Sequence, residues 1–164
     1  MDLRDYQRIE TQVNDIRFGL INIYMFQSDP NRLIMEKINK SISTEDHDFN
    51  HLQSQHRHKL EHPSLLKMIA CTRTDSMFET NAFFEYPNDD LYARQKHLTN
   101  SSELVKFSMH MLEVLSYLQE RQYVHGDLRP EYIFFDEDTQ KYILLDRVSD
   151  SSSYSHAQRT NLIY

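Results

Sequence analysis

Glycine is scarce in this chain, because only Gly19 and Gly126 occur among its 164 residues. Loops that hold the phosphates of a nucleotide need glycine, since a side chain keeps the backbone amides away from the ligand. Neither G-x-G-x-x-G nor G-x-x-x-x-G-K occurs in the sequence. The composition therefore excludes a conventional glycine-rich phosphate-binding loop.

Three further absences narrow the possible functions. The single cysteine, Cys71, cannot form an internal disulfide, which favours a reducing compartment. No block of lysines and arginines interrupts the net charge of -7, so we expect no nucleic-acid partner. Charged residues follow Met1 at once, and no apolar run approaches the roughly 18 residues that a membrane span needs. We therefore expect no secretory signal or membrane span, and a cytoplasmic protein, for example one within a cytoskeletal or other large assembly.

The residues that are present suit a folded globular domain. Hydrophobic residues make up 39% of the chain and charged residues 26%, which argues against wholesale disorder. Segments rich in β-branched and aromatic residues predict strands. The predicted strands are Tyr6–Val13, Leu20–Phe26, Arg32–Ile38, Leu65–Cys71, Phe78–Tyr86, Ile133–Phe135 and Tyr142–Leu145.

Two helices are expected between these strands. One covers residues 44–61, with Thr44 as its N-cap and Pro63 beyond its end. The other covers residues 101–121, where Asn100 and Glu103 suit a capping box. Its predicted apolar face consists of Leu104, Phe107, Met111, Leu115 and Leu118. The serine-rich stretch that follows residue 148 has no clear pattern, and we expect it to be flexible.

The most informative stretch is Tyr123–Phe135, which reads Y-V-H-G-D-L-R-P-E-Y-I-F-F. It resembles the catalytic loop of eukaryotic protein kinases, H-R-D-L-K-P-E-N-I-L. Three further matches follow the family's order and spacing. His62-Pro63-Ser64-Leu65-Leu66 resembles the H-P-N-I-V after the αC helix, Phe83-Phe84-Glu85-Tyr86 resembles strand five entering the hinge, and Val114-Leu115-Ser116-Tyr117-Leu118 precedes the loop as in the family.

This resemblance implies an α+β fold. Residues 1–86 would form a protein-kinase-like N-lobe, with a five-stranded antiparallel sheet and an αC-like helix. Residues 87–148 would form a truncated C-lobe, with a long αE-like helix, a catalytic-loop-like segment and a β-hairpin. Residues 149–164 would be a flexible tail that resembles an activation segment.

The resemblance also assigns candidate site residues, some kept and some replaced. Asp127 stands at the family's catalytic base and Arg129 at the lysine two residues on. For nucleotide binding the candidates are Lys37, in a V-A-I-K-like motif, and Glu85 at the hinge. Asp146 is the candidate ligand for Mg²⁺, in a region resembling D-F-G that keeps only its aspartate.

Several replacements weaken the predicted chemistry. Gln53 stands where the αC helix supplies a glutamate to the lysine, although Asp48 and Glu45 lie within a turn or two. Tyr132 replaces the asparagine that binds the second Mg²⁺, and a phenol is a poor ligand for that ion. Met35 replaces an alanine that packs on the adenine, and Pro87 aligns at or beside a hinge residue whose N–H faces it. We therefore expect either no cofactor or only weak binding of ATP and Mg²⁺.

Three functions are compatible with these residues. The leading hypothesis is a catalytically impaired kinase-like protein, a pseudokinase, that acts as a binding or structural subunit of a larger intracellular assembly. One or more partner chains would cover the surface of helix 101–121. The second hypothesis is a divergent ATP-dependent Ser/Thr-type protein kinase with residual phosphoryl transfer. The third hypothesis is a small-molecule phosphotransferase of the aminoglycoside type. It ranks last because those enzymes keep an asparagine at the position that Tyr132 occupies here.

One short motif in the sequence resembles a zinc site. His58-Lys59-Leu60-Glu61-His62 fits the H-x-x-E-H pattern of inverted zinc proteases. The stretch ends a helix against Pro63, where the kinase spacing already explains it. No metal other than Mg²⁺ is therefore expected.

Overall fold

The computed structural model describes residues 3–15, 17–87, 100–145 and 148–150, and the chain divides into two compact units. Unit 1 consists of Met1–Glu61 and Lys67–Asn88, and unit 2 of His62–Leu66 and Asp89–Tyr164. No helix in the described ranges is long and apolar enough to cross a membrane.

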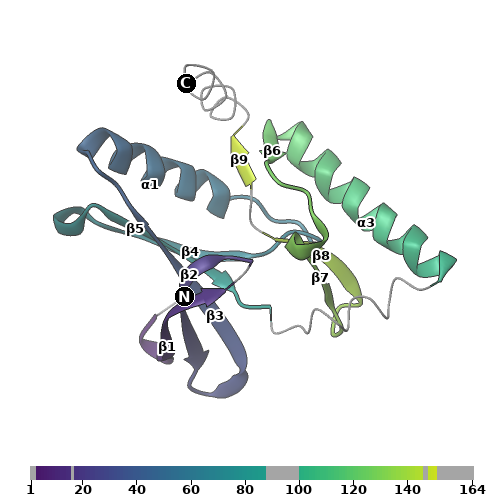
Figure 1. The fold of residues 1–164 in the computed structure, drawn as a ribbon, viewed down its shortest axis with the longest axis horizontal. Coiled ribbons are helices and arrows are strands. Elements are labelled where there is room, and N and C mark those ends of the chain that lie inside the picture. The colour runs from purple at the N-terminus through teal and green to yellow at the C-terminus, as the bar shows by residue number, and fades with distance from the viewer. Residues whose placement is uncertain (1–2, 16, 88–99, 146–147, 151–164) are drawn as a thin grey trace. The chain divides into compact units, whose positions relative to one another are not determined.

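Unit 1 is built on one antiparallel sheet (Figure 1). Its strands are β1 (Tyr6–Asp15), β2 (Gly19–Phe26), β3 (Asp29–Lys40), β4 (Met68–Thr74) and β5 (Glu79–Glu85), in the spatial order β1-β2-β3-β5-β4. Short 3-10 turns at Leu3–Asp5 and Asp75–Met77 precede β1 and β5. The five-stranded antiparallel sheet predicted from the sequence is confirmed.

Strand β4 begins three residues later than predicted. Leu65 and Leu66 belong instead to unit 2, where the Leu66 N–H donates to the carbonyl of Leu144 over 2.8 Å. The Leu144 N–H in turn donates to the Ser64 carbonyl over 2.9 Å. Apolar residues thus continue along the chain from unit 2 into unit 1 with only Lys67 between them, which is why the pattern placed the start of the strand too early.

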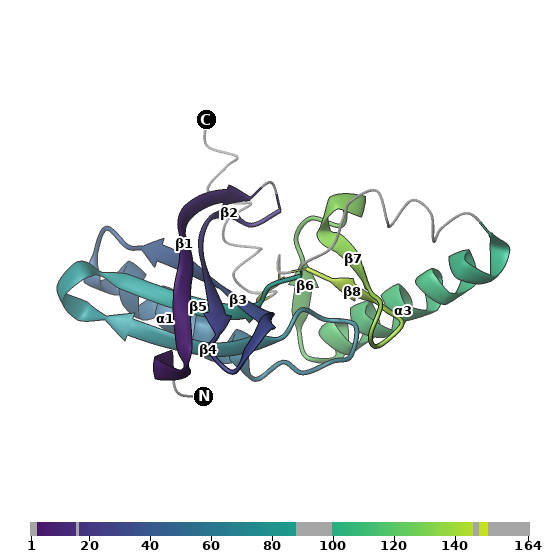
Figure 2. The same cartoon turned by 90° about the horizontal axis from the view of Figure 1, so that it is seen from below.

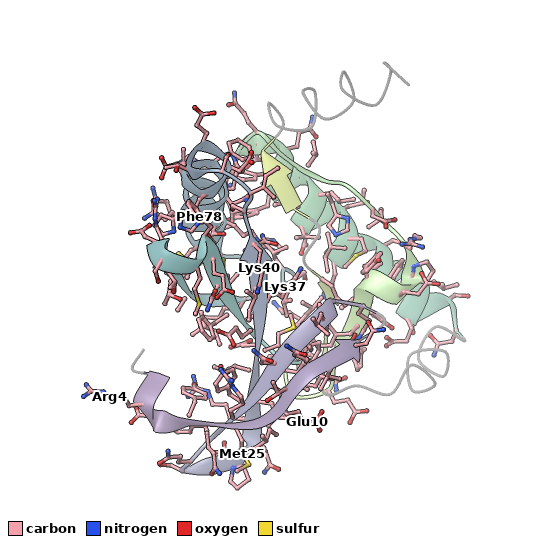
Figure 3. All side chains as sticks on the ribbon, turned by 60° about the vertical axis from the view of Figure 1, so that its left-hand side comes forward. Arg4, Glu10, Met25, Lys37, Lys40 and Phe78 are labelled. Carbon is pink, nitrogen blue, oxygen red and sulfur yellow. The ribbon has the colours of Figure 1, made fainter. Side chains whose placement is uncertain are left out.

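The helix α1 (Thr44–His58) packs on β4 and β5. Its N-cap is Ser43 rather than the predicted Thr44, since the Ser43 hydroxyl accepts from the Asp46 N–H over 3.1 Å. The first turns of α1 are tied to the β4–β5 connection. Asp48 pairs with Arg73 over 2.7 Å, and the ring of Phe78 packs edge-on against buried His47, as the position of Phe78 beside α1 shows (Figure 3).

Unit 2 combines one long helix with short strands (Figure 2). It contains α3 (Ser101–Glu120), β6 (Tyr123–His125), β7 (Ile133–Asp136), β8 (Lys141–Leu144) and β9 (Val148–Asp150), with a 3-10 turn at Pro130–Tyr132. β7 and β8 form the expected hairpin, and β9 pairs with β6, a pairing that the sequence did not predict. The rest of the predicted flexible tail, residues 151–164, lies outside the described residues.

The N-cap of α3 agrees with the prediction, but its buried face differs in part. The Asn100 side chain accepts from the Glu103 N–H over 2.9 Å. The buried residues of α3 are Met111, Val114 and Leu118; Val114 was not predicted, whereas the predicted Phe107 and Leu115 are half-buried and Leu104 is exposed. The large apolar side chains that stay exposed are Leu104, Val105, Met109 and Leu112.

Candidate functional site

The predicted site residues are distributed over both units. Lys37, Gln53 and Glu85 lie in unit 1, whereas Asp127 and Arg129 lie in unit 2. Asp146, the predicted Mg²⁺ ligand, lies outside the described residues. The predicted site therefore consists of two half-sites, a nucleotide half-site in unit 1 and a catalytic-loop half-site in unit 2.

The side chain of Lys37 lies on the face of the sheet that α1 covers. Strand alternation puts Met35 and Lys37 on one face, and their partners across the sheet include Ile23 and Ile21 on β2 and Phe84 and Ala82 on β5. Arg57 of α1 extends its guanidinium over the ring of Phe84, 5.6 Å from the centroid, so α1 covers this face. Figure 3 shows Lys37 on β3, close to Lys40 at the end of the strand. The role of Lys37 in binding phosphate stays a prediction.

The acid that would orient Lys37 is missing from the position predicted for it. Gln53 lies half-buried in α1, and its amide carries no charge. Asp48, one of the two nearby acids, is directed to the β4–β5 connection and pairs with Arg73. One turn beyond Gln53, α1 instead buries the cation of Arg57, which is 5% exposed. The sequence analysis missed Arg57, because an arginine in a polar helix gives no sign that it is buried.

The interior beneath Lys37 is filled by side chains. Met35 is fully buried, and Ile21 and Phe84 are each only 2% exposed. Met35 stands where the family has an alanine in contact with the adenine, so its thioether fills the volume that a smaller side chain would leave. This packing supports the expectation that Met35 crowds a nucleotide.

The backbone of the predicted hinge is engaged within unit 1. The N–H of Glu85 donates to the carbonyl of Lys67 over 3.1 Å, and the N–H of Tyr86 donates to the carbonyl of Leu33 over 3.0 Å. Pro87 has no N–H. The Glu85 side chain is exposed and, by strand alternation from Phe84, lies on the face opposite Lys37. Residues 85–87 therefore offer no unused amide to the edge of an adenine.

In unit 2 the catalytic-loop motif folds around one ion pair. Arg129 donates two hydrogen bonds to the Asp127 carboxylate, from Nε to Oδ1 over 2.7 Å and from Nη2 to Oδ2 over 2.6 Å. This two-pronged geometry is the strongest form of a carboxylate–guanidinium contact. It raises the pKa of Arg129 from its ordinary value. Both oxygens of the predicted catalytic base are thus in contact with a neighbouring cation.

Tyr132 completes this arrangement from the position of the family's asparagine. It is 4% exposed, its hydroxyl accepts from Arg129 Nη2 over 3.0 Å, and the guanidinium lies 5.0 Å from its ring centroid. The backbone of Tyr132 is held as well, because its carbonyl accepts from the Leu145 N–H over 2.7 Å. The side chain that replaces a metal ligand therefore serves as a buried support for Arg129.

His125 keeps a structural contact of the loop. Its Nε2 lies 3.0 Å from the Leu145 carbonyl, and its Nδ1 lies 3.4 Å from the Asp127 N–H. A carbonyl only accepts and an N–H only donates, so these partners fit the tautomer protonated on Nε2. His125 thereby links the loop to the end of the β7–β8 hairpin.

Comparison with known proteins agrees with this architecture. The family model for protein tyrosine and serine/threonine kinases matches residues 12–159. A relative in Schizosaccharomyces pombe, named serine/threonine-protein kinase ppk24, mitochondrial, is 35% identical over 88 residues. That match covers 49% of this chain and 19% of the relative. The chain belongs to the protein tyrosine and serine/threonine kinase family.

Proposed function

We propose that this protein is a catalytically impaired member of its family, a pseudokinase that serves as a binding or structural subunit of a larger intracellular assembly. The observation that carries the proposal is the state of Asp127. Its carboxylate accepts two hydrogen bonds from Arg129, and Arg129 is supported by Tyr132 where the family has a metal ligand. A base in this position needs an oxygen available for the hydroxyl of the substrate.

The nucleotide half-site supports the same proposal. Lys37 has no glutamate at the Gln53 position, and residues 85–87 lack an unused amide for the adenine. Removing one charge-stabilising group from an active site commonly lowers the rate by a factor of about 10² to 10³. Such losses need not be additive, but two of them bring transfer close to background.

The exposed side of α3 supports a binding role. Val105, Met109 and Leu112 follow one another at helical spacing and are 60%, 54% and 68% exposed. Clusters of large exposed apolar side chains commonly mark surfaces that another chain covers. We expect the protein expressed alone to aggregate, and less so when all three residues are replaced by glutamine. The proposal that a partner chain covers α3 would be refuted if the unmodified protein unfolds cooperatively and sediments as a monomer.

The central test is phosphoryl transfer by the full chain. The protein would be incubated with radiolabelled ATP, Mg²⁺ and a mixed library of peptides that carry serine, threonine and tyrosine. We expect no more incorporation than for the variant Asp127→Asn. The matched control is Asp138→Asn, which removes an exposed carboxylate from the β7–β8 turn.

A second candidate function is a divergent protein kinase with residual transfer. It is favoured by the preserved Asp127 and Arg129, by Lys37 on the α1 side of the sheet, and by the printed name of the S. pombe relative. Incorporation that is lost in Asp127→Asn but kept in Asp138→Asn would establish this function and overturn the proposal.

A further inference from the structure

We propose that the β1–β2 turn is an autoinhibitory contact that closes the nucleotide half-site of unit 1. Asp15, Arg17, Phe18, Tyr86 and Pro87 form a cluster, called the turn cluster below. In the family the β1–β2 turn covers the phosphates, and here it binds the hinge instead. The inference rests on the proposed function and deepens it, because it names a reversible cause for weak nucleotide binding.

The polar part of the turn cluster is a buried ion pair between neighbours in sequence. Arg17 donates to Asp15 from Nε to Oδ1 over 3.1 Å and from Nη2 to Oδ2 over 3.0 Å, and the Arg17 N–H also donates to Oδ1 over 2.7 Å. The two side chains are only 8% and 9% exposed. Burial opposes ionisation of Asp15, but its hydrogen bonds and the Arg17 charge prevail and lower its pKa.

From this ion pair the turn reaches the hinge. Arg17 Nη1 donates to the carbonyl of Pro87 over 3.2 Å, and the hydroxyl of Tyr86 donates to Asp15 Oδ2 over 3.1 Å. The partners are 69 to 71 residues apart along the chain. Burial, followed by the charge of Asp15, raises the pKa of the Tyr86 phenol. Together with the hydrogen bond that Arg17 Nη2 donates to the Tyr86 hydroxyl over 3.4 Å, three polar contacts thus join the tip of the β1–β2 hairpin to the segment that would recognise adenine.

The apolar part of the turn cluster fills the space between turn and hinge. The Arg17 guanidinium lies 5.0 Å from the ring centroid of Phe18 and 5.6 Å from that of Tyr86, within the range of cation–π attraction. The two rings themselves are 6.4 Å apart, and Phe18 is 7% exposed. A flat cation thus lies close to two aromatic rings.

The turn cluster lies on the face that carries Lys37. Strand alternation and register put Asp15 on the same face as Val13 and Ile21, and Ile21 pairs with Lys37. Tyr86 follows Phe84 by two residues and accordingly lies on that face too. The turn cluster therefore joins the β1–β2 turn to the hinge on the face of the sheet that a base entering beside Met35 would approach.

Opening of the turn cluster then controls nucleotide affinity. When only the open form binds, the apparent dissociation constant is the intrinsic one divided by the open fraction. Variants that weaken the cluster raise this fraction. We expect Arg17→Ala and Phe18→Ala to bind nucleotide at least about tenfold more tightly than the unmodified protein. Asp15→Asn keeps the shape and removes the charge, so we expect a smaller gain.

The test measures binding of mant-ATP with Mg²⁺ to the full chain by fluorescence titration, with unlabelled ATP as competitor. Matched controls are Arg32→Ala, whose guanidinium lies over Phe26, and Phe49→Ala, which is 50% exposed on α1. Both should leave the affinity unchanged. Circular dichroism and amide exchange establish that each variant is folded. If Arg17→Ala does not fold, Arg17→Lys replaces it, because lysine keeps the charge but cannot form the two-pronged contact.

Two outcomes overturn the autoinhibitory contact: equal affinity in the unmodified protein and the folded variants, or no binding by any of them. Phosphoryl transfer measured on the same proteins separates this result from the proposed function. Tighter binding without transfer supports both proposals. If the variants bind nucleotide more tightly and also transfer phosphate, and if Asp127→Asn abolishes this transfer, the autoinhibitory contact is supported and the pseudokinase proposal is refuted.

Discussion

Unit 1 and unit 2 bury different kinds of side chain. Of the buried polar side chains among the described residues, six lie in unit 1 and only Ser64 lies in unit 2; the six are Arg17, Asn22, Glu36, His47, Arg57 and Thr80. The interior of unit 2 consists almost entirely of apolar side chains. The least exposed, at 1% or below, are Val114, Leu118, Leu144 and Leu145. Directional bonds hold buried polar groups in one geometry, whereas apolar packing tolerates more change. The shape of unit 1 should therefore depend on single polar residues.

Glu36 is the clearest example in unit 1. Its carboxylate accepts from Asn22 over 2.8 Å, from Tyr24 over 2.7 Å and from Asn81 over 2.9 Å. Arg8 approaches to 3.8 Å. These contacts connect β3 with β1, β2 and β5 on the face opposite Lys37.

The same difference runs through the two half-sites. In the nucleotide half-site of unit 1, Arg17, Phe18 and Tyr86 pack together and Met35 is buried. In unit 2 Asp127 is kept in the sequence, and two replacements near it make its contacts: Arg129 binds the carboxylate, and Tyr132 supports Arg129. The two half-sites therefore depart from the family pattern in different ways: large packed side chains in one, and altered polar partners in the other.

The largest expected effect is on Glu36. Replacing Glu36 by alanine leaves the buried donor of Asn22 and the half-buried donors of Tyr24 and Asn81 without their acceptor, and breaking such a cluster typically costs about 4 kcal/mol of unfolding free energy. Amide hydrogen exchange, resolved by segment, should show the loss in β1, β2, β3 and β5 of unit 1. Glu10→Ala, an exposed carboxylate on β1, is the control and should change stability by less than about 0.5 kcal/mol. Equal losses in α3 would show that the two units do not differ in the way argued here.

Leu118 offers the reciprocal change in unit 2. It is 1% exposed, and truncation of a buried leucine to alanine costs about 3 kcal/mol. Protection should fall in α3 and the β7–β8 hairpin while the sheet of unit 1 keeps its own. Leu112→Ala removes the same atoms from an exposed position of the same helix and should have little effect on stability. If both variants destabilise the chain equally, apolar packing is not what holds unit 2.

The apolar pattern made most of the fold predictable. Segments rich in β-branched and aromatic residues predicted the strands, the resemblance to protein kinases predicted their five-stranded antiparallel sheet, and the helical repeat with Asn100 predicted α3 with its cap. Errors arose where apolar residues stand on both sides of a boundary between units, as Leu65 and Met68 do, and in the first turn of a helix, where Leu104 has the spacing of the buried face but is exposed. Motif spacing also placed Lys37 and Gln53 on β3 and α1.

The polar clusters were not predictable in the same way. Nothing in the sequence marks Glu36 as buried rather than exposed, since its donors come from residues 14 and 45 positions away. Arg17 and Phe18 could be recognised as the wrong residues for a phosphate-binding turn, but not as partners of Tyr86 and Pro87. Hydrogen bonds between distant residues depend on register and side-chain direction, which residue-type patterns do not contain.

The smallest effect concerns the hydrogen bond that the Tyr142 side chain makes in the largely apolar core of unit 2. Tyr142 is 2% exposed, and its hydroxyl donates to Glu103 over 3.0 Å. Burial, followed by the hydrogen bond and the charge of Glu103, raises the pKa of Tyr142 to about 12. Near neutral pH we expect Tyr142→Phe to lower the unfolding free energy by about 1 kcal/mol, the typical net value of one hydrogen bond.

Alkaline pH should reverse this order. A phenol whose pKa is higher in the folded state than in the unfolded state stabilises the fold below about pH 10, and this stabilisation is lost as the pH rises toward about 12. The unmodified protein loses up to about 2.7 kcal/mol over this range through Tyr142, whereas Tyr142→Phe loses nothing at this position. Urea unfolding of both proteins between pH 8 and 12 should therefore give stability curves that cross. Parallel curves would mean that water reaches the phenol of Tyr142, and that the interior of unit 2 is not closed by apolar groups at this position.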